Sequence, residues 1–291
     1  HSWYEDWLQV YGGDGFKDTH GYVKLEKNSK GRLDTNDYNW FESDKFWNHI
    51  ESNIPNMQHV YMAGGEPLMI ERHYDFLQKC VDMGQAKKMT IEYNTNMTNL
   101  QSRVLDLWKH FKTVRVGASV DGMGKVVEYQ RHPAKWPIIL RNLQTVDSLD
   151  KNVQAWLACT VTTLNVFHIP EFIKWKIMES NFKKINSSKK LPVLTIHVAH
   201  SPASSCIKIL PPEMKKLVRE KYDAFKDWVI SEKLDPNIEA AAIQIINNIV
   251  QFMMSEDRSE KWNWFIEYTK QLDKLRDQTI VDIVPEYESY F

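Results

Sequence analysis

The organisation of this chain can be worked out from one stretch, Val60-Tyr61-Met62-Ala63-Gly64-Gly65-Glu66-Pro67-Leu68. A short apolar run that begins at residue 58 ends in a polar turn, and apolar positions spaced as in a helix follow it to residue 83. The two glycines let backbone N–H and C=O groups approach a ligand because no Cβ is in the way. The proline suits the first turn of a helix, where its missing N–H costs least. The stretch predicts a strand, a tight turn and a helix, and by itself it fits either an ordinary turn or a ligand-binding one.

The same pattern of strand and helix repeats along the chain. Further strands are predicted over residues 89–93, 113–118, 153–163 and 194–198, and helices over residues 44–54, 100–111, 125–130, 137–149 and 169–182. Strands that alternate with helices of this length form a parallel sheet with right-handed crossovers. We therefore expect an α/β fold in which the strands present their C-terminal ends on one side, where barrels and open sheets bind their ligands.

Short polar segments follow four of the predicted strands. They are Gly64-Gly65-Glu66-Pro67, Asn94-Thr95-Asn96, Ser119-Val120-Asp121-Gly122 and Thr163-Leu164-Asn165. Because parallel strands end together, these segments should share one rim, which would suit a polar small molecule. Turns also favour Asn, Asp, Gly and Ser for their own geometry. Position and spacing together, more than residue type, favour the ligand-binding interpretation.

The chain divides into two regions. Residues 1–205 hold the α/β pattern, with a helix predicted over residues 1–11 and a long loop over residues 12–43. Residues 206–291 predict three amphipathic helices, which begin near residues 211, 238 and 260, and a strand over residues 280–284. We expect this second region to be a helical extension that packs against the α/β part or offers a surface to a partner.

Composition and charge exclude several classes of protein. The 291 residues carry a net charge of −1 with a pI of about 6.9, so no basic field favours nucleic acid or a membrane surface as a partner. No apolar run approaches the roughly 18 residues of a membrane span, and no secretory signal opens the chain. Cys80, Cys159 and Cys206 lie far apart and form neither a disulfide framework nor a metal motif. These features favour the cytoplasm.

Other catalytic motifs do not occur. Neither G-x-G-x-x-G nor G-x-x-x-x-G-K-[ST] appears at a strand–helix junction, and H-E-x-x-H is absent from the sequence. Four residues near strand ends would point toward the rim, namely Glu92, Tyr93, His197 and His200. None of these residues can be named as a catalytic acid or base from the sequence.

The strand-end segments together resemble the radical SAM enzymes. The stretch Met62-Ala63-Gly64-Gly65-Glu66-Pro67-Leu68 looks like the GGEP motif of that family, which contacts the amino group of S-adenosylmethionine. The resemblance implies that Gly64, Gly65, Glu66 and Pro67 bind this cofactor. The turn Asn94-Thr95-Asn96 stands where the family often has a TNG-like turn, which implies a similar role for Asn94 and Asn96.

Two further segments resemble one branch of the family, whose members carry SPASM or twitch auxiliary domains. Ser119-Val120-Asp121-Gly122 is similar to a turn of that branch whose polar residues help to hold the ribose or carboxylate of the cofactor, which implies roles for Ser119 and Asp121. Arg131 stands where the branch often has an arginine for the cofactor carboxylate, and Asn165 matches a polar residue after the following strand. The resemblance covers residues 57–200. It implies a partial (β/α)6 barrel that lacks its first strand.

The family's signature CxxxCxxC is absent from these residues. In the family its thiolates bind three irons of a four-iron-four-sulfur cluster, and without them no cluster is held. We expect that the first strand, the cluster-binding segment and an N-terminal twitch domain precede His1 in a longer protein. The cluster ligands would then lie outside this chain, which would bind the cofactor but be inactive by itself.

The resemblance implies an enzyme that takes electrons from an external donor and abstracts hydrogen from a substrate, such as a peptide or protein. Two alternatives stay open. One is a non-catalytic binding protein on the same scaffold that has lost the cluster. The other is a different (β/α) barrel enzyme in which Glu66 and Asp121 serve as acid and base.

Overall fold

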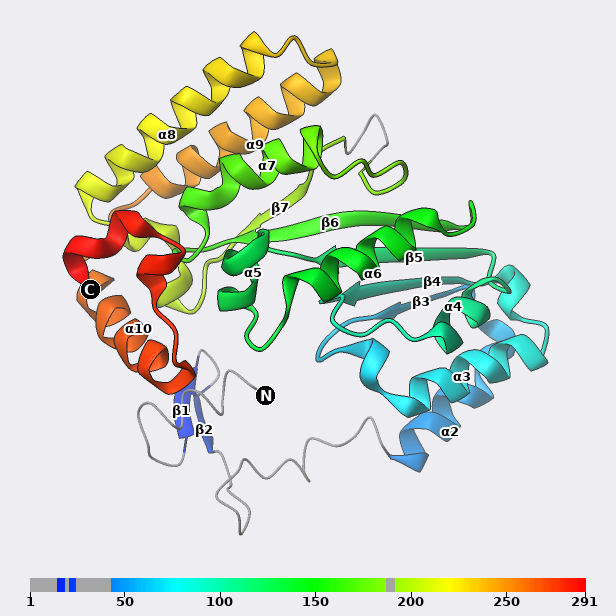
Figure 1. Cartoon of the computed structure of the whole chain (residues 1–291). Coiled ribbons are helices and arrows are strands. Elements are labelled where there is room, and N and C mark those ends of the chain that lie inside the picture. Colours follow the sequence, from blue (N-terminus) through cyan, green and yellow to red (C-terminus); the bar gives the residue numbers. More distant parts are fainter. Residues whose placement is uncertain (1–14, 19–20, 25–42, 187–191) are drawn as a thin grey trace.

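A computed structural model describes residues 15–18, 21–24, 43–186 and 192–291 of the chain, and its centre is a parallel sheet (Figure 1). The five strands follow one another in the order β3-β4-β5-β6-β7, and every neighbouring pair is parallel. Their bounds are β3 (His59–Met62), β4 (Thr90–Thr95), β5 (Thr113–Ser119), β6 (Val153–Val161) and β7 (Thr195–Val198). The predicted α/β class and its strands are therefore confirmed.

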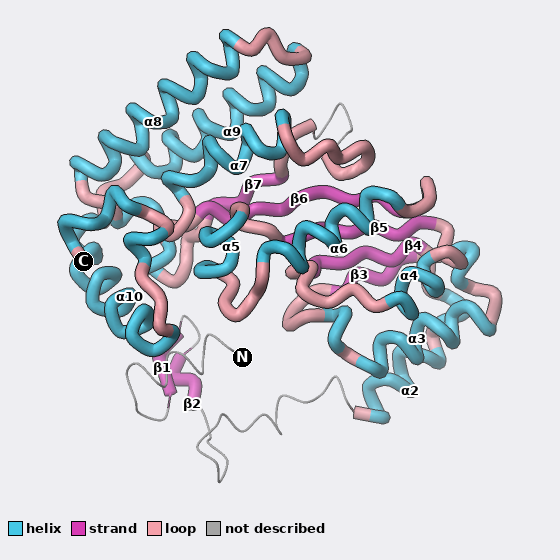
Figure 2. Tube along the Cα trace, viewed as in Figure 1, coloured by secondary structure: helices cyan, strands magenta, loops and turns pink. Residues whose placement is uncertain are grey.

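One helix precedes the first strand of this sheet, and the others connect each of its strands to the next. They are α2 (Asp44–Ser52), α3 (Glu71–Asp82), α4 (Ser102–Trp108), α5 (Gly124–Gln130), α6 (Trp136–Ser148) and α7 (Ile169–Met178). Because each crossover moves one strand along in the same direction, right-handed connections place these helices on one side of the sheet. Figure 1 and Figure 2 show α3, α4 and α6 along one side of the strands. This arrangement is that of a partial β/α barrel.

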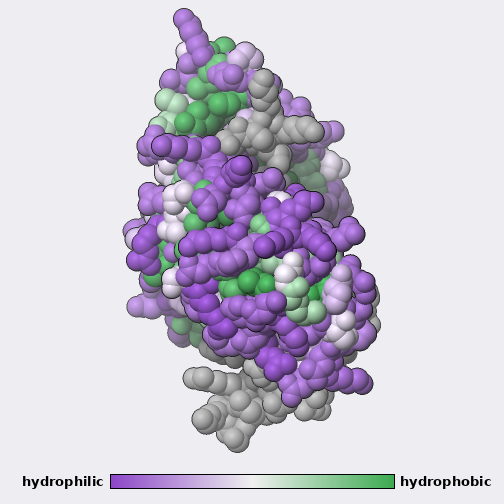
Figure 3. Space-filling model, turned by 90° about the vertical axis from the view of Figure 1, so that its right-hand side faces the viewer, coloured by the Kyte–Doolittle hydropathy of each residue, from purple (hydrophilic) through white to green (hydrophobic). Residues whose placement is uncertain are grey.

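The C-terminal region is helical, as expected. It contains α8 (Pro212–Ser231), α9 (Pro236–Met254) and α10 (Trp262–Arg276). Short 3-10 segments complete the chain at Ile54–Asn56, Pro67–Met69, Ala86–Lys88, Val166–His168, Ala203–Ser205, Ile207–Ile209, Ser259–Lys261, Ile280–Asp282 and Pro285–Tyr290. Figure 3 shows a largely hydrophilic side of the molecule, with hydrophobic side chains near the top, toward the end of the α8–α9 pair, and again near the centre.

The strand predicted over residues 280–284 is wrong, because Ile280–Asp282 is a 3-10 helix. Ile280 and Val284 are both buried, and a spacing of four residues fits a helical turn rather than the period of two in a strand. The Val284 N–H donates to the Ile280 carbonyl at 2.8 Å. A short apolar run with buried positions four apart was therefore misread as extended.

The two predicted regions share one hydrophobic core. Buried residues of α8, α9 and α10, such as Tyr222, Ile246 and Phe265, belong to the same cluster as the buried residues of the sheet. The hydroxyl of Tyr222 donates to the Val166 carbonyl at 2.7 Å, and that of Tyr287 donates to the Thr163 carbonyl at 2.8 Å. The C-terminal helices thus hold the loops after β6 in place. The boundary at residue 205 stays a prediction.

The N-terminal expectations are only partly open to comparison. The helix predicted over residues 1–11 lies outside the described residues. Within the loop predicted over residues 12–43, the structure contains two antiparallel strands, β1 (Gly15–Asp18) and β2 (Gly21–Lys24), so the loop prediction is wrong there. Aromatic and β-branched residues in Gly-Phe-Lys-Asp and Gly-Tyr-Val-Lys favour strands, and these short signals were outweighed by the many Gly, Asn and Asp residues around them.

The two faces of the sheet differ sharply in burial. One face carries buried residues such as Ile91, Val116 and Leu157, which pack under the connecting helices. The opposite face carries polar and aromatic side chains that water reaches, among them Tyr61, which is 55% exposed. Parallel sheets are normally covered on both faces. The face that the described residues leave uncovered is the one that would line the inside of a barrel, and we call it the open face.

In the described part of the chain, no helix has the length and apolar character needed to cross a bilayer.

Candidate functional site

The turn after β3 presents free backbone groups. Gly64 and Gly65 have φ values of +88° and +57°, and a Cβ added to either would meet no atom within 4 Å. Both glycines are exposed, and within the described residues neither takes part in a backbone hydrogen bond. Their positive φ values explain why glycine occupies these positions. Unpaired C=O groups at a strand end can accept hydrogen bonds from the amino group of a ligand.

Glu66 ties this turn to the end of the neighbouring strand. Its Oε1 accepts from the Thr95 hydroxyl at 2.7 Å and from the Leu68 N–H at 3.3 Å, and its Oε2 accepts from the Asn96 N–H at 2.8 Å. Pro67 is buried at the first position of the 3-10 segment Pro67–Met69. Both residues therefore stabilise the local structure, and the hydrogen bonds of Glu66 join the turns after β3 and β4 into one unit.

The remaining polar residues of this part of the rim differ in exposure and partners. The Asn94 amide donates to the Tyr61 hydroxyl at 2.6 Å on the open face. Asn96 accepts from the N–H and the hydroxyl of Thr98 at 2.9 and 2.6 Å, which stabilises its own turn. Ser119 is partly exposed at the end of β5, and its hydroxyl has no partner among the described residues. Asn94, Asn96 and Ser119 are all partly exposed at strand ends, and Asn96 alone uses its side chain to hold its own turn.

A buried group of polar residues joins the ends of β5 and β6, and we call it the strand-end network. It consists of Asp121, Arg131, Thr160 and Asn165. Asp121 is 3% exposed, and its carboxylate accepts from Arg131 Nε at 2.7 Å and from the Thr160 N–H at 2.7 Å. Asn165 is fully buried, and its amide donates to the Asp121 carbonyl at 2.7 Å and to the Thr160 carbonyl at 3.0 Å. The network fixes the Ser-Val-Asp-Gly turn against β6.

Arg131 has one bonded edge and one free edge. Asp121 takes its Nε, while the two terminal guanidinium nitrogens have no partner among the described residues. The side chain is 26% exposed. A guanidinium fork held in this way is suited to bind a carboxylate with two parallel hydrogen bonds. The pairing with Asp121 orients the fork before any ligand arrives.

His168 is a residue of this region that sequence reasoning missed. Its Nε2 accepts from the Met123 N–H at 3.2 Å, and its ring would lie 2.9 Å from a Cβ at position 122, which explains the glycine there. Burial lowers the pKa of His168 to about 4. The ring is therefore neutral at pH 7 and acts as an acceptor. A lone histidine at the start of a helix carries no sequence signal for this role. Thr160 was missed because it stands inside a predicted strand. Thr95 belongs to the predicted rim segment Asn94-Thr95-Asn96, but its bond to Glu66 depends on strand register and carries no sequence signal.

The chain's cysteines do not suit an iron–sulfur cluster. Cys80, Cys159 and Cys206 are buried on α3, on β6 and before the 3-10 segment Ile207–Ile209. Burial raises the pKa of Cys80 to about 12, and it also raises that of Cys159, so these thiols resist becoming thiolate ligands. The described residues include no group of three or more His, Cys, Asp or Glu side chains placed to hold a metal ion.

The four residues expected to point toward the rim do not share one location. Tyr93 is fully buried and faces the helices, where its hydroxyl forms a hydrogen bond with His73 Nε2 at 2.9 Å. The predicted orientation of Tyr93 was therefore wrong. The strand pleat explains this, because successive side chains point to opposite faces. Glu92 and His197 lie on the open face. The His200 ring packs at 4.7 Å from Phe252 of α9.

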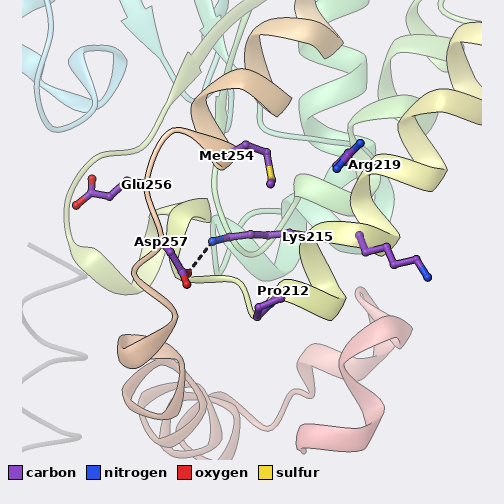
Figure 4. A pocket seen from close by; sticks show the side chains of 7 residues that line it. Pro212, Lys215, Arg219, Met254, Glu256 and Asp257 are labelled. Carbon is purple, nitrogen blue, oxygen red and sulfur yellow. Dashed lines mark hydrogen bonds and ion pairs between the residues drawn. The ribbon is translucent and has the colours of Figure 1, made fainter.

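A separate cavity of about 220 Å³ lies away from the rim, between the start of α8 and the end of α9 (Figure 4). Lys215 points across it to Asp257, and their charged atoms lie 2.9 Å apart. Glu256, which also lines the cavity, pairs with Lys208 at 3.2 Å and with Arg258 at 2.8 Å. Most charges of this cavity are therefore already neutralised within the chain.

Comparison with known proteins gives little. No protein-family model matches the chain, and no curated protein matches it. Among solved structures, the chain is similar to a domain of pyruvate-formate lyase-activating enzyme from Bacteroides vulgatus ATCC 8482, with 14% sequence identity and a TM-score of 0.32. The match covers 58% of this chain and 94% of that one. A likeness at this level carries no argument about function, which must come from the residues themselves.

Proposed function

We propose that this chain is the S-adenosylmethionine-binding core of a radical SAM enzyme. The observation that carries the proposal is the free backbone of Gly64 and Gly65 at the end of β3, in a turn held rigid by Glu66. A ligand amino group needs acceptors, and the two glycine carbonyls offer them without a side chain in the way. The order of the strand-end segments, which resembles that family, adds to this observation.

The rim would hold the other parts of the cofactor through two kinds of contact. The free fork of Arg131 would bind the carboxylate with charge-assisted hydrogen bonds. Asn94 and Ser119, which face water at strand ends, would bind hydroxyl groups of the ribose. Asp121 and Asn165 are too deeply buried to contact a ligand through their side chains, and they would act by holding Arg131 and the turn.

The cofactor, together with a reduced iron–sulfur cluster, supplies the chemistry that removes a hydrogen atom from a substrate, while the protein binds and orients it. The buried cysteines of this chain make ligands from elsewhere necessary. We therefore place the cluster ligands outside these 291 residues, where an external donor would deliver the electron. A peptide or protein substrate stays a prediction from the resemblance to the twitch-containing branch.

The acid–base alternative is disfavoured by the partners of its two carboxylates. Glu66 accepts three hydrogen bonds within the chain, and Asp121 is buried against Arg131. A general base must lie within hydrogen-bond reach of the proton it removes from a substrate. Both carboxylates instead hold turns together.

The first test is binding of S-adenosylmethionine to the chain, measured by isothermal titration calorimetry. We expect Arg131→Gln to weaken binding about 10-fold or more, because a hydrogen bond to a charged group contributes roughly 1.5–3 kcal/mol. Arg103→Gln is the matched control, since Arg103 is exposed and contacts Glu71, Tyr74 and Asp75, which all lie on α3. Equal binding by the two variants, or no binding by the unaltered chain, would contradict the proposal.

The second test uses the full-length gene product, loaded anaerobically with iron and sulfide. We expect a visible cluster absorbance and reductive cleavage of S-adenosylmethionine. Binding of the cofactor with no cluster would instead favour the non-catalytic binding protein. Neither binding nor cleavage would favour a different barrel enzyme.

A further inference from the structure

The open face of the sheet carries an ordered group of side chains next to the Gly64–Gly65 turn, and we call it the platform. It consists of Tyr61, Glu92, Asn94, Arg115 and Trp156. Strand register places Tyr61 beside Glu92, Glu92 beside Arg115, and Asn94 one step from Trp156 across Gly117. Four adjacent strands, β3 to β6, therefore contribute to one surface.

Gly117 is the floor of the platform. A Cβ at this position would lie 2.7 Å from Asn94 Oδ1 and 2.8 Å from the Trp156 ring. Real Cβ atoms do not approach other heavy atoms so closely, so the amide and the indole lean over the glycine from the strands on either side. The absence of a side chain at position 117 is what allows Asn94 and Trp156 to meet.

The charges of the platform neutralise one another. Arg115 donates to Glu92 at 2.7 Å, and its guanidinium lies over the Trp156 ring at 5.5 Å from the ring centroid. A cation in this position is attracted to the ring face and holds the indole in place. Because Glu92 and Arg115 pair with each other, the platform offers no unpaired formal charge to a ligand ion.

The accessible polar groups are hydroxyls and amides. Tyr61 is 55% exposed, and Asn94, Ser119 and Thr160 are partly exposed on the same face. A hydroxyl donates and accepts hydrogen bonds, and an amide does both through its two ends. The partly exposed Trp156 ring adds a flat apolar surface among these groups.

This combination matches a sugar. Each hydroxyl of a sugar needs both a donor and an acceptor, and the C–H groups on one side of its ring make an apolar surface that packs on an indole. An extended peptide matches less well, because the face of a sheet offers no free backbone N–H or C=O for a ladder of main-chain hydrogen bonds.

We propose that the platform binds a neutral, hydroxyl-rich ring, a sugar or sugar-like substrate, beside the cofactor turn. This rests on the proposed function for the chemistry that follows binding, and it names a different substrate class from the peptide or protein that the resemblance implies. The ribose of S-adenosylmethionine has the same chemistry, so the test must separate a substrate sugar from the cofactor's own.

The test is ligand-observed NMR of a panel of neutral sugars, namely glucose, galactose, N-acetylglucosamine and ribose, with an uncharged tripeptide amide for comparison. We expect saturation transfer from the protein to the ring protons of at least one sugar, and its loss in Trp156→Ala and Asn94→Ala. The matched control is Trp228→Ala. Trp228 also has a cation over its ring, Lys174 at 4.6 Å, but it stands on α8 away from the sheet.

The outcomes separate the two proposals. Sugar binding that persists in the presence of S-adenosylmethionine and depends on Trp156 supports the platform as a substrate site. Competition between the sugar and S-adenosylmethionine assigns the platform to the cofactor ribose and overturns the inference. Binding of the peptide alone, or of no probe, also overturns it. Calorimetry of S-adenosylmethionine binding in the absence of sugar is a separate measurement, and it tests the proposed function whichever of these outcomes is found.

Gly117→Ala gives an independent check that leaves every polar group present. The added Cβ would push the Asn94 amide and the Trp156 ring apart. We expect sugar binding to fall at least 10-fold, and urea denaturation shows that the variant is folded. Cofactor binding is not the control for this variant, because Asn94 also belongs to the proposed cofactor site. Unchanged sugar binding in a folded Gly117→Ala protein would contradict the platform.

Discussion

The Gly64–Gly65 turn and the strand-end network occupy the ends of neighbouring parts of one sheet, yet they are built in opposite ways. The turn is exposed and has unpaired backbone groups, whereas Asp121 and Asn165 are buried and nearly every polar atom they offer is paired. The sequence resemblance gave both the same expected role. The structure divides that role into residues that would contact a ligand and residues that hold the contacting ones in position.

The largest predicted effect is a loss of stability when Asn165 of the strand-end network is replaced. Asn165→Leu removes the acceptor of the Thr162 N–H and the donor to the Asp121 carbonyl, and both groups stay buried. Each buried polar group left unpaired costs about 1–3 kcal/mol, so we expect a loss of roughly 3 kcal/mol or more in the free energy of unfolding. Urea denaturation measures it.

Asn247→Ala is the control for this substitution, because Asn247 is exposed on α9. It should change stability by less than about 0.5 kcal/mol. If Asn165→Leu were no more destabilising than the control, the network would not hold the rim together.

The next effect is a loss of stability at acidic pH, which arises from His168. Burial lowers the pKa of His168 to about 4, whereas the unfolded chain binds this proton near pH 6.5. The stabilisation from a neutral His168 is therefore present above about pH 6.5, and it is lost as the pH falls toward 4, by about 3 kcal/mol at most. Buried His73, whose pKa burial also lowers to about 4, contributes in the same direction.

His168→Gln isolates the share that belongs to the rim. Glutamine keeps an acceptor for the Met123 N–H but binds no proton in this range. Urea denaturation at each pH measures the free energy of unfolding. We expect its decrease between pH 6.5 and 4 to be about half as large in His168→Gln as in the unaltered chain. An exposed histidine on α4's C-terminal side, His110, provides the control as His110→Gln. An unchanged slope in His168→Gln would show that the ring is not held neutral.

The contrast between the two regions also explains what sequence could predict. Strand, turn and helix were visible because hydrophobic periodicity and residues such as Gly64 and Pro67 act locally. The pairing of Asp121 with Arg131, and of Asn165 with the Asp121 carbonyl, depends on how residues 10 and 44 positions apart meet in space. The open-face platform was missed for the same reason, since Trp156 meets Asn94 only through strand register.

A smaller effect sharpens the comparison at the turn itself. Gly65 and Gly84 have φ values of +57° and +70°, so an alanine at either position adds a Cβ to a left-handed residue. Neither Cβ would meet another atom within 4 Å. Each should cost about 1 kcal/mol of stability from backbone strain alone. Only Gly65→Ala should weaken S-adenosylmethionine binding, because Gly84 lies at the end of α3. Calorimetry and urea denaturation on both variants measure the two effects. Equal loss of binding would mean that general strain, not the turn, is responsible.

The smallest effect tests whether exposure at a strand end marks a ligand contact. Ser119 has a partly exposed hydroxyl without a partner, so Ser119→Ala removes nothing that the folded chain uses, and its stability should change by less than about 0.5 kcal/mol. If the hydroxyl bonds to the cofactor, its loss should weaken binding by roughly 0.5–1.5 kcal/mol, a factor of about 2 to 10. Thr98→Val is the contrasting change, because the Thr98 hydroxyl is already bonded to Asn96 and should matter for stability rather than binding. Calorimetry of both variants decides between the two. A reversed pattern would mean that the free hydroxyls of the rim are not the ones that contact the ligand.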